Sequence, residues 1–209
     1  MNFIPYEEAK GLIKEGDILL FRGVGLIGFF IKRYTSGNHS HVAITHLDGD
    51  TWECVEFKEF MGGRSVALKG QVDANPTTID VFRPLGKISY EELNDGVLSV
   101  VNKAYTEEVA KNTVRDIIKW TGQPYGWGNI WGMLIRFVPL VKLFMKQNTN
   151  DDELSKAKVC STAVTIALRK NYMDPVPYLA DDRVSPADLA RSPLLQYLFT
   201  IEKDFKTGE

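Results

Sequence analysis

Two β-rich segments joined by Asp48-Gly49 restrict the fold more than any other feature of the sequence. The first segment, residues 41–46, reads His-Val-Ala-Ile-Thr-His, and the second, residues 51–57, reads Thr-Trp-Glu-Cys-Val-Glu-Phe. An Asp-Gly pair between two such segments is the strongest short signal for a β-hairpin. We therefore predict an antiparallel hairpin over residues 41–57.

The hairpin loop determines which residues face each other. With Asp48-Gly49 as a two-residue loop, Leu47 pairs with Asp50. His41 then faces Glu56, and a four-residue loop gives the same register. A carboxylate directly opposite a histidine can accept a hydrogen bond from one imidazole nitrogen and leave the other as a base. A polar pair without a catalytic role is the alternative, and a three-residue loop would change the register.

A second constraint comes from residues 159–164, Val-Cys-Ser-Thr-Ala-Val. Apolar residues follow Cys160 at four, seven and eight positions, as on one face of a helix: Val164, Ala167 and Leu168. We predict a buried helix that Cys160 opens. The positive end of the helix dipole stabilises a thiolate there, and the thiolate is the nucleophilic form. The alternative is a cysteine that serves only as a small buried hydrophobe.

The remaining segments predict a mixture of strands and helices. We expect strands over residues 17–21, 65–69 and 78–83, and helices over residues 6–14 and 24–34. Ser89 and Glu92 form a capping box, which predicts a helical region up to Trp120, broken near Thr106. Ser185-Pro186 is expected to cap a last short helix. A few strands among these helices indicate an α+β fold.

Composition sets limits on the class of protein. A chain of 209 residues suits a single domain, so we predict one domain over 1–209 with an insertion at 129–158. Hydrophobic residues make up 44% of the chain and charged residues 25%, which is typical of globular proteins. A net charge of −2 gives no electrostatic case for binding nucleic acid. The first residues lack the basic region and apolar core of a signal peptide, so we expect a cytoplasmic protein with reduced cysteines.

The other histidines and the other cysteine are expected to be structural. His46 points away from His41 under strict alternation and His39 precedes the strand, so both are predicted to lie at the surface. Residues 39–41 with a cysteine suggest zinc, but no second Cys-x-x-Cys or His-x-x-x-His element supplies further ligands. We therefore predict neither a metal nor a cofactor. Cys54 lies within a strand, away from any helix terminus.

Four motifs in order resemble the permuted papain-like cysteine hydrolases: Gly-Asp-Ile-Leu-Leu-Phe at 16–21, Ser-His-Val-Ala-Ile at 40–44, Val-Glu-Phe at 55–57 and the late Cys160-Ser161. These proteins are circularly permuted relatives of the NlpC-type cell-wall peptidases and kin of the lecithin:retinol acyltransferase group. The resemblance covers residues 16–189. It implies a permuted papain-like fold, in which a small antiparallel sheet or half-barrel packs against the nucleophile helix with additional helices around it.

The resemblance also implies roles for individual residues. Cys160 would be the nucleophile, His41 the base and Glu56 the residue that orients His41. The segment 123–128, Gln-Pro-Tyr-Gly-Trp-Gly, is similar to the family's approach to the cysteine helix. Three residues would accordingly line the substrate site: Tyr125, Trp127 and Ser40. The long gap between this segment and the cysteine helix departs from the family pattern.

Together these features predict a thiol hydrolase. A cysteine beside an imidazole forms a reactive thiolate–imidazolium pair, which attacks a carbonyl and gives a thioester intermediate. The resemblance implies a cell-wall-like peptide or another amide as the substrate. A lipid acyl hydrolase or acyltransferase is an alternative. A non-catalytic member that binds a lipid or peptide in the same cleft is another.

Residues 129–147 form an apolar segment that Arg136, Pro139 and Lys142 interrupt, which is not the pattern of a transmembrane helix. One interpretation is a pair of short helices that cover the core. The other is a lid beside the cleft, where apolar surface flanked by basic residues would suit an acyl chain or peripheral membrane contact.

Overall fold

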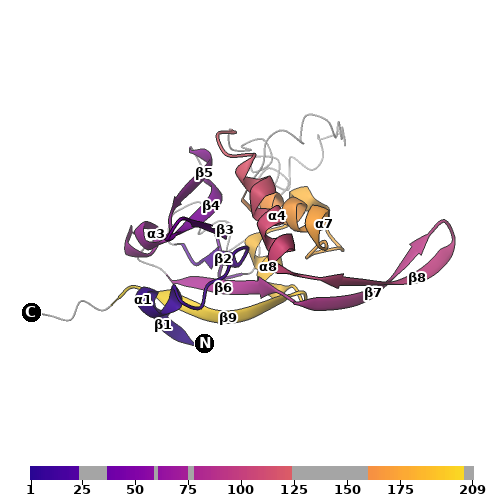
Figure 1. Cartoon of the computed structure of the whole chain (residues 1–209), viewed down its shortest axis with the longest axis horizontal. Coiled ribbons are helices and arrows are strands. Elements are labelled where there is room, and N and C mark those ends of the chain that lie inside the picture. The colour runs from indigo at the N-terminus through magenta and orange to yellow at the C-terminus, as the bar shows by residue number, and fades with distance from the viewer. Residues whose placement is uncertain (24–36, 59–60, 75–77, 124–159, 205–209) are drawn as a thin grey trace, which may run out of the picture.

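The protein is built on one mixed sheet with helices on both faces (Figure 1). The computed structural model describes residues 1–23, 37–58, 61–74, 78–123 and 160–204. Seven strands follow the order β1-β9-β6-β2-β3-β4-β5, and neighbours are antiparallel except for the parallel pair β1–β9. Their bounds are β1 Phe3–Pro5, β2 Ile18–Phe21, β3 His41–Asp48, β4 Thr51–Lys58, β5 Gly62–Ala67, β6 Ile79–Pro84 and β9 Leu195–Glu202.

Each face of the sheet carries its own hydrophobic core. Helices α4 (Glu107–Ile118) and α7 (Cys160–Asn171) cover one face, while α1 (Tyr6–Ala9) and α3 (Leu68–Ala74) cover the other. Successive side chains of a strand point to opposite faces, so Ile18 and Leu20 of β2 enter the first core and Leu19 enters the second. A 3₁₀ turn η2 (Asp181–Arg183) and α8 (Pro186–Arg191) follow α7. The predicted α+β class is therefore confirmed.

The predicted hairpin is present, but its register differs from the expected one by two residues. Asp48 pairs with Thr51, and Ala43 pairs with Glu56. The loop is Gly49-Asp50, because Gly49 takes the first loop position with a φ of 57°, which favours glycine. A shift of two residues preserves the face on which each side chain lies, since the side-chain period of a strand is two. His41 and Glu56 therefore remain on one face, as diagonal rather than direct neighbours.

The helix predicted from Ser89 to Trp120 is wrong over its first half. Residues there form a separate hairpin of β7 (Lys87–Asn94) and β8 (Val97–Ala104). Its turn is Asp95-Gly96, with φ values of 50° and 80°, and two consecutive positive φ angles fit the type I′ turn that joins twisted strands. The helix begins after Thr106, whose side chain accepts a hydrogen bond from the Val109 N–H.

The other predicted elements agree with the structure to different degrees. The strands at 17–21 and 78–83 are confirmed as β2 and β6. The cap predicted at Ser185 is also confirmed, and it takes the form of a capping box with Asp188 at the start of α8. The helix at 6–14 is reduced to α1, and the strand at 65–69 starts earlier, as β5, and gives way to α3. The helix predicted at 24–34 lies outside the described residues.

Gly63 of β5 sits where any side chain would collide with the core. Its N–H donates to the Gln123 carbonyl, and a Cβ atom there would lie 2.7 Å from the Trp120 carbonyl oxygen and 2.9 Å from the Phe57 ring. We expect Gly63→Ala to lower the free energy of unfolding by about 1–3 kcal/mol, measured by urea denaturation. Gly70→Ala is the control, because Gly70 is exposed in α3 and a Cβ there meets nothing within 4 Å.

The control substitution replaces a helical glycine by the best helix former and should leave stability unchanged or raise it by up to about 1 kcal/mol. Equal destabilisation by the two substitutions would contradict the close approach of β5 to the segment that follows α4.

Candidate active site

Cys160 lies at the start of α7, on the side that faces the sheet. The residue is 6% exposed and belongs to the core between α7 and the sheet. Two hydroxyls of the first turn hold the helix start against the segment that follows it. Ser161 donates to the Val184 carbonyl at 2.5 Å, and Thr162 donates to the Asp181 carbonyl at 3.2 Å. The helix predicted from the spacing after Cys160 is thus confirmed.

His41 is the first residue of β3, and its imidazole bonds to Glu56 as expected. Nε2 lies 2.6 Å from a carboxylate oxygen of Glu56. The ring packs against Phe21, its direct partner on β2, with the ring centroids 5.3 Å apart. One carboxylate and one aromatic ring therefore fix the orientation of the imidazole.

Arg64 completes the surroundings of the Glu56 carboxylate. Glu56 is buried, and Arg64, directly opposite it on β5, donates from Nε at 2.9 Å and from Nη2 at 2.6 Å to the second carboxylate oxygen. The sequence does not predict Arg64 as a site residue, because the strand expected at 65–69 starts one residue after it. The signal that could have indicated it is the presence of a basic residue directly before the strand that follows the 41–57 hairpin.

The negative charge of Glu56 and the positive charges of His41 and Arg64 stabilise one another. Burial alone would lower the pKa of His41, but the charge and hydrogen bonding of Cys160, together with Glu56, raise this pKa to about 10. Burial raises the pKa of Glu56, and the opposing interactions with His41 and Arg64 lower it to about 2. At neutral pH Glu56 is therefore a carboxylate and His41 an imidazolium whose Nε2–H donates to it.

The second imidazole nitrogen is the one left for chemistry. Nδ1 of His41 is buried, and no hydrogen bond of ordinary geometry joins it to the described residues, so its interaction with Cys160 is a looser one. Since Glu56 occupies Nε2, a proton exchanged with the nearby Cys160 has to pass through Nδ1. The arrangement can thus hold a proton at a fixed nitrogen beside a thiol, which is what nucleophilic catalysis by a cysteine needs.

Of the second cysteine and the residues predicted to line the substrate site, Cys54 and Ser40 are buried in the described structure, and the others lie outside it. Cys54 is buried in β4 within the opposite core, where burial raises the pKa of its thiol well above the usual value, so the structural role expected for it fits. Ser40 is buried, and its N–H donates to the Phe21 carbonyl at 2.9 Å while its hydroxyl lies 3.5 Å from the same oxygen. Tyr125, Trp127 and the segment 129–158 lie outside the described residues.

The surface position predicted for His39 is wrong. His39 is 8% exposed, and Nε2 lies 2.7 Å from the buried carboxylate of Asp80. Arg22 also donates to this carboxylate, at 2.9 and 2.7 Å, and Thr200 donates to it at 2.7 Å. Asp80 is 41 residues away along the chain, so no local pattern indicated the pairing. The protein therefore holds a second cluster of histidine, carboxylate and arginine.

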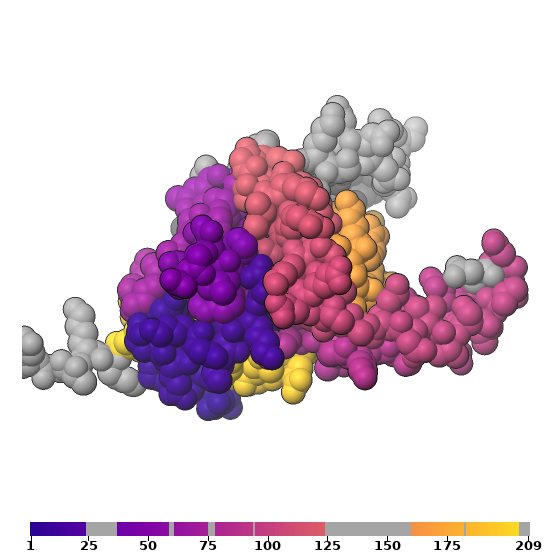
Figure 2. All heavy atoms as spheres, viewed as in Figure 1, coloured from indigo at the N-terminus to yellow at the C-terminus, as the bar shows by residue number. Residues whose placement is uncertain are grey.

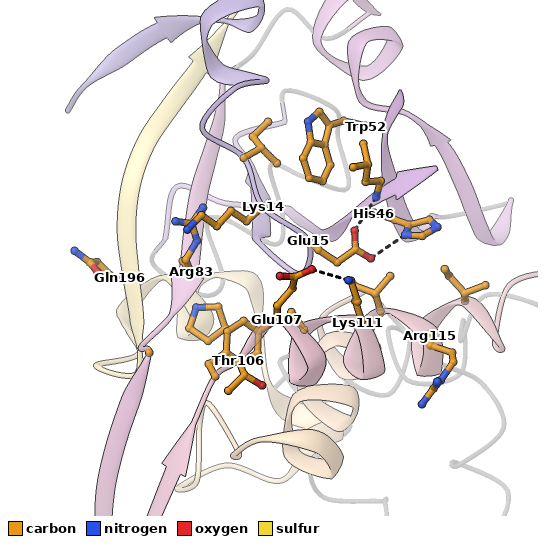
Figure 3. Close-up of a pocket in the computed structure, with 18 residues that line it drawn as sticks. Lys14, Glu15, His46, Trp52, Arg83, Thr106, Glu107, Lys111, Arg115 and Gln196 are labelled. Atoms are coloured by element: carbon orange, nitrogen blue, oxygen red, sulfur yellow. Dashed lines mark hydrogen bonds and ion pairs between the residues drawn. The ribbon is translucent and has the colours of Figure 1, made fainter. Parts of the chain in front are cut away.

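His46 is half-buried and lines a large pocket, which is separate from the cysteine. It bonds to Glu15 at 2.9 Å (Figure 3). The pocket has a volume of about 960 Å³ and lies between α4, the loop before β2 and the junction of β6 with β7. Its lining residues include neither Cys160 nor His41 nor Glu56.

Comparisons with known proteins give a likeness of fold. No family model and no curated protein matches the chain. The crystal structure of metalloprotein yiiX from Escherichia coli O157:H7, assigned to DUF1105, aligns with a TM-score of 0.56 and 14% sequence identity over 92% of this chain and 98% of that one. At this identity the likeness concerns the fold alone.

Two further features of the described residues concern metals and membranes. Those residues hold no group of three or more His, Cys, Asp or Glu side chains placed to bind a metal ion. None of the helices in the described ranges is long and apolar enough to cross a membrane.

Proposed function

We propose that this chain is a cysteine hydrolase that cleaves an amide or ester bond through a thioester at Cys160, in a permuted papain-like fold. The observation that carries the proposal is the buried pair of His41 and Glu56 beside a cysteine at a helix start. Each member alone is common in protein interiors. Their combination supplies a nucleophile, a proton carrier and an orienting carboxylate in one place.

The proposed reaction uses each group in turn. The Cys160 thiolate attacks the substrate carbonyl carbon, and the resulting oxyanion is stabilised by backbone N–H groups at the start of α7, which have no intrahelical acceptor. The His41 imidazolium then gives its Nδ1 proton to the leaving amine or alkoxide. Water, deprotonated by the neutral imidazole, hydrolyses the thioester. Glu56 stays ionised throughout, and Arg64 is a positioning residue that holds it.

The substrate class proposed is a peptide-like or other small amide. A lipid acyl substrate is the alternative, and it depends on residues 129–147, which lie outside the described ranges. The yiiX structure is that of a metalloprotein, and at 14% sequence identity this property is not carried over to the present chain.

Alkylation by iodoacetamide tests the proposal without knowledge of the substrate. We expect Cys160 to be labelled at least about 100-fold faster than Cys54 near neutral pH, because only Cys160 has an imidazolium beside it. Peptide mass mapping over a time course gives both rates in one sample. The matched variant His41→Gln should lose most of the difference.

A model ester extends the test to catalysis. Incubation with p-nitrophenyl acetate should leave an acetyl group on Cys160, visible as a mass increase of the intact protein that Cys160→Ala abolishes. Labelling of Cys160 only after unfolding, together with no acetyl adduct, would contradict the hydrolase and favour a binding protein.

A further inference from the structure

The β7–β8 hairpin projects from the body of the molecule as an arm, residues 87–104 (Figures 1 and 2). Within the described part of the chain its two strands pair only with each other. An isolated two-stranded hairpin is marginally stable in water. Both outer edges of the arm also offer unpaired backbone groups to another strand.

The outer half of the arm exposes apolar side chains without cover. Four of them are more than 60% exposed: Leu93 at 66%, Val97 at 66%, Leu98 at 62% and Val100 at 66%. Leu93 and Leu98 are direct cross-strand partners, so their side chains form one patch beside the turn. A contiguous apolar patch at the end of a projecting element is typical of a contact surface.

Charge is divided along the arm. The outer half, residues 91–100, carries three acidic residues and no basic one: Glu91, Glu92 and Asp95. The inner half carries Lys87 and Lys103 and no acidic residue. Among the described residues, none of these five makes an ion pair. Two arms side by side would therefore match opposite charges when antiparallel and like charges when parallel.

The pocket of Figure 3, here called the basal pocket, lies where the arm leaves the body. Residues before β7 and after β8 line it, including Gly86 and Thr106. Its walls carry the apolar side chains Leu47, Trp52, Val114 and Ile118. Glu15 and Glu107 are already bonded to His46 and Lys111. Two exposed cations, Lys14 and Arg115, make no ion pair within the described part of the chain.

The basal pocket and the outer half of the arm are complementary but cannot meet within one molecule. Eight extended residues at about 3.4 Å each hold the tip about 27 Å from the base. Two antiparallel arms, in contrast, bring each acidic, apolar tip to the basic, apolar base of the other. The exchange is reciprocal, so it closes as a two-fold dimer.

We propose that two copies of this chain form a dimer by exchanging their arms, with each tip seated on the partner's basal pocket. The arms gain cover for the exposed apolar patch and partners for their strand edges. The three carboxylates of each tip meet Lys87, Lys103 and Arg115 of the partner. An anionic membrane fits the tip less well, because those carboxylates would be repelled by it.

Sedimentation velocity over a concentration series tests the proposal on the full chain. We expect a concentration-dependent dimer for the wild type. Leu98→Asp should weaken it at least about tenfold, since it places a charge in the covered patch. Tyr178→Asp is the matched control, because Tyr178 is 66% exposed but belongs to neither the arm nor the pocket, and it should dimerise as the wild type does.

Charge reversal in two separate proteins gives the sharper test. Glu91→Lys with Glu92→Lys reverses the tip, and Lys87→Glu with Arg115→Glu reverses the base. Each double variant alone should dimerise at least about tenfold more weakly than the wild type, because like charges meet at both contacts. An equimolar mixture should recover the wild-type dissociation constant within about threefold, since both contacts then join opposite charges.

A wild type that stays monomeric at every concentration would overturn the proposal, as would a mixture that associates no better than its components. Binding of the monomer to phosphatidylserine vesicles, lost in Leu98→Asp, would assign the patch to a membrane instead. All five substituted tip and base residues lie at exposed positions, so an unchanged thermal unfolding midpoint will show that the variants remain folded.

Discussion

Cys160→Ala is expected to reduce hydrolysis of an activated ester such as p-nitrophenyl acetate to the background rate. Loss of a nucleophile typically lowers kcat by about 10⁴-fold or more, because no thioester can form. The fold should persist, since alanine fits the start of a helix and removes only the thiol from a site in the core between α7 and the sheet. The cost in unfolding free energy is expected to stay within about 1–2 kcal/mol. Steady-state kinetics and urea denaturation of the same samples measure both effects.

Cys54→Ala is the control for this experiment. Cys54 is as buried as Cys160 but lies mid-strand in the other core, so its replacement should cost similar stability and retain most of the activity. The reverse pattern, with activity lost in Cys54→Ala and kept in Cys160→Ala, would be incompatible with the assigned nucleophile.

Local sequence signals predicted those parts of the fold that local physics decides. The hairpin at 41–57, the helix after Cys160 and the capping box at Ser185 each depend on neighbours in the chain, and each is present. The sequence predicts a helix in place of the arm because Ser89 and Glu92 satisfy the capping pattern. Asp95-Gly96 is the same kind of turn signal as Asp48-Gly49, and it marks the turn of this second hairpin.

The candidate site was predictable in part for a physical reason. His41 and Glu56 share a hairpin, and the period of two kept them on one face although the expected register was wrong by two residues. Arg64 lies on the neighbouring strand β5, opposite Glu56. It is not predicted as a site residue because the expected strand starts after it. His39 and Asp80 meet only because β6 folds back beside β2, so tertiary structure alone brings them together.

Glu56→Gln is expected to lower kcat by about 10²-fold or more, though less than His41→Ala does. The amide keeps the shape of the side chain but removes the charge that favours the imidazolium, so His41 takes and holds a proton less readily. Iodoacetamide alkylation of Cys160 as a function of pH measures this directly. An alkylation rate unchanged by the substitution across the pH range would contradict the pairing.

Asp80→Asn is the matched control for Glu56→Gln. Asp80 is also a buried carboxylate bonded to a histidine and an arginine, but its histidine is His39 rather than His41. Asp80→Asn should therefore lower the free energy of unfolding, as the loss of a buried carboxylate with three partners does. The alkylation rate of Cys160 should stay within about threefold of the wild-type rate. An equal fall in that rate for both variants would mean that general loosening of the sheet, and not the His41–Glu56 pair, controls the thiol.

The same pair should make stability depend on pH in two opposite ways. The pKa of Glu56 is about 2 in the folded protein against 4.5 for a free side chain, so its contribution is present above pH 4.5 and lost as the pH falls toward 2. The pKa of His41 is about 10 against 6.5, so its contribution is complete below pH 6.5 and lost as the pH rises through 10. The cluster therefore stabilises the fold most between pH 4.5 and 6.5. In urea denaturation, Glu56→Gln should reduce the acid-side loss, to which the buried Asp80 also contributes because its pKa is lowered too, and should flatten the alkaline one. An unchanged pH profile in this variant would rule out a charged His41–Glu56 pair.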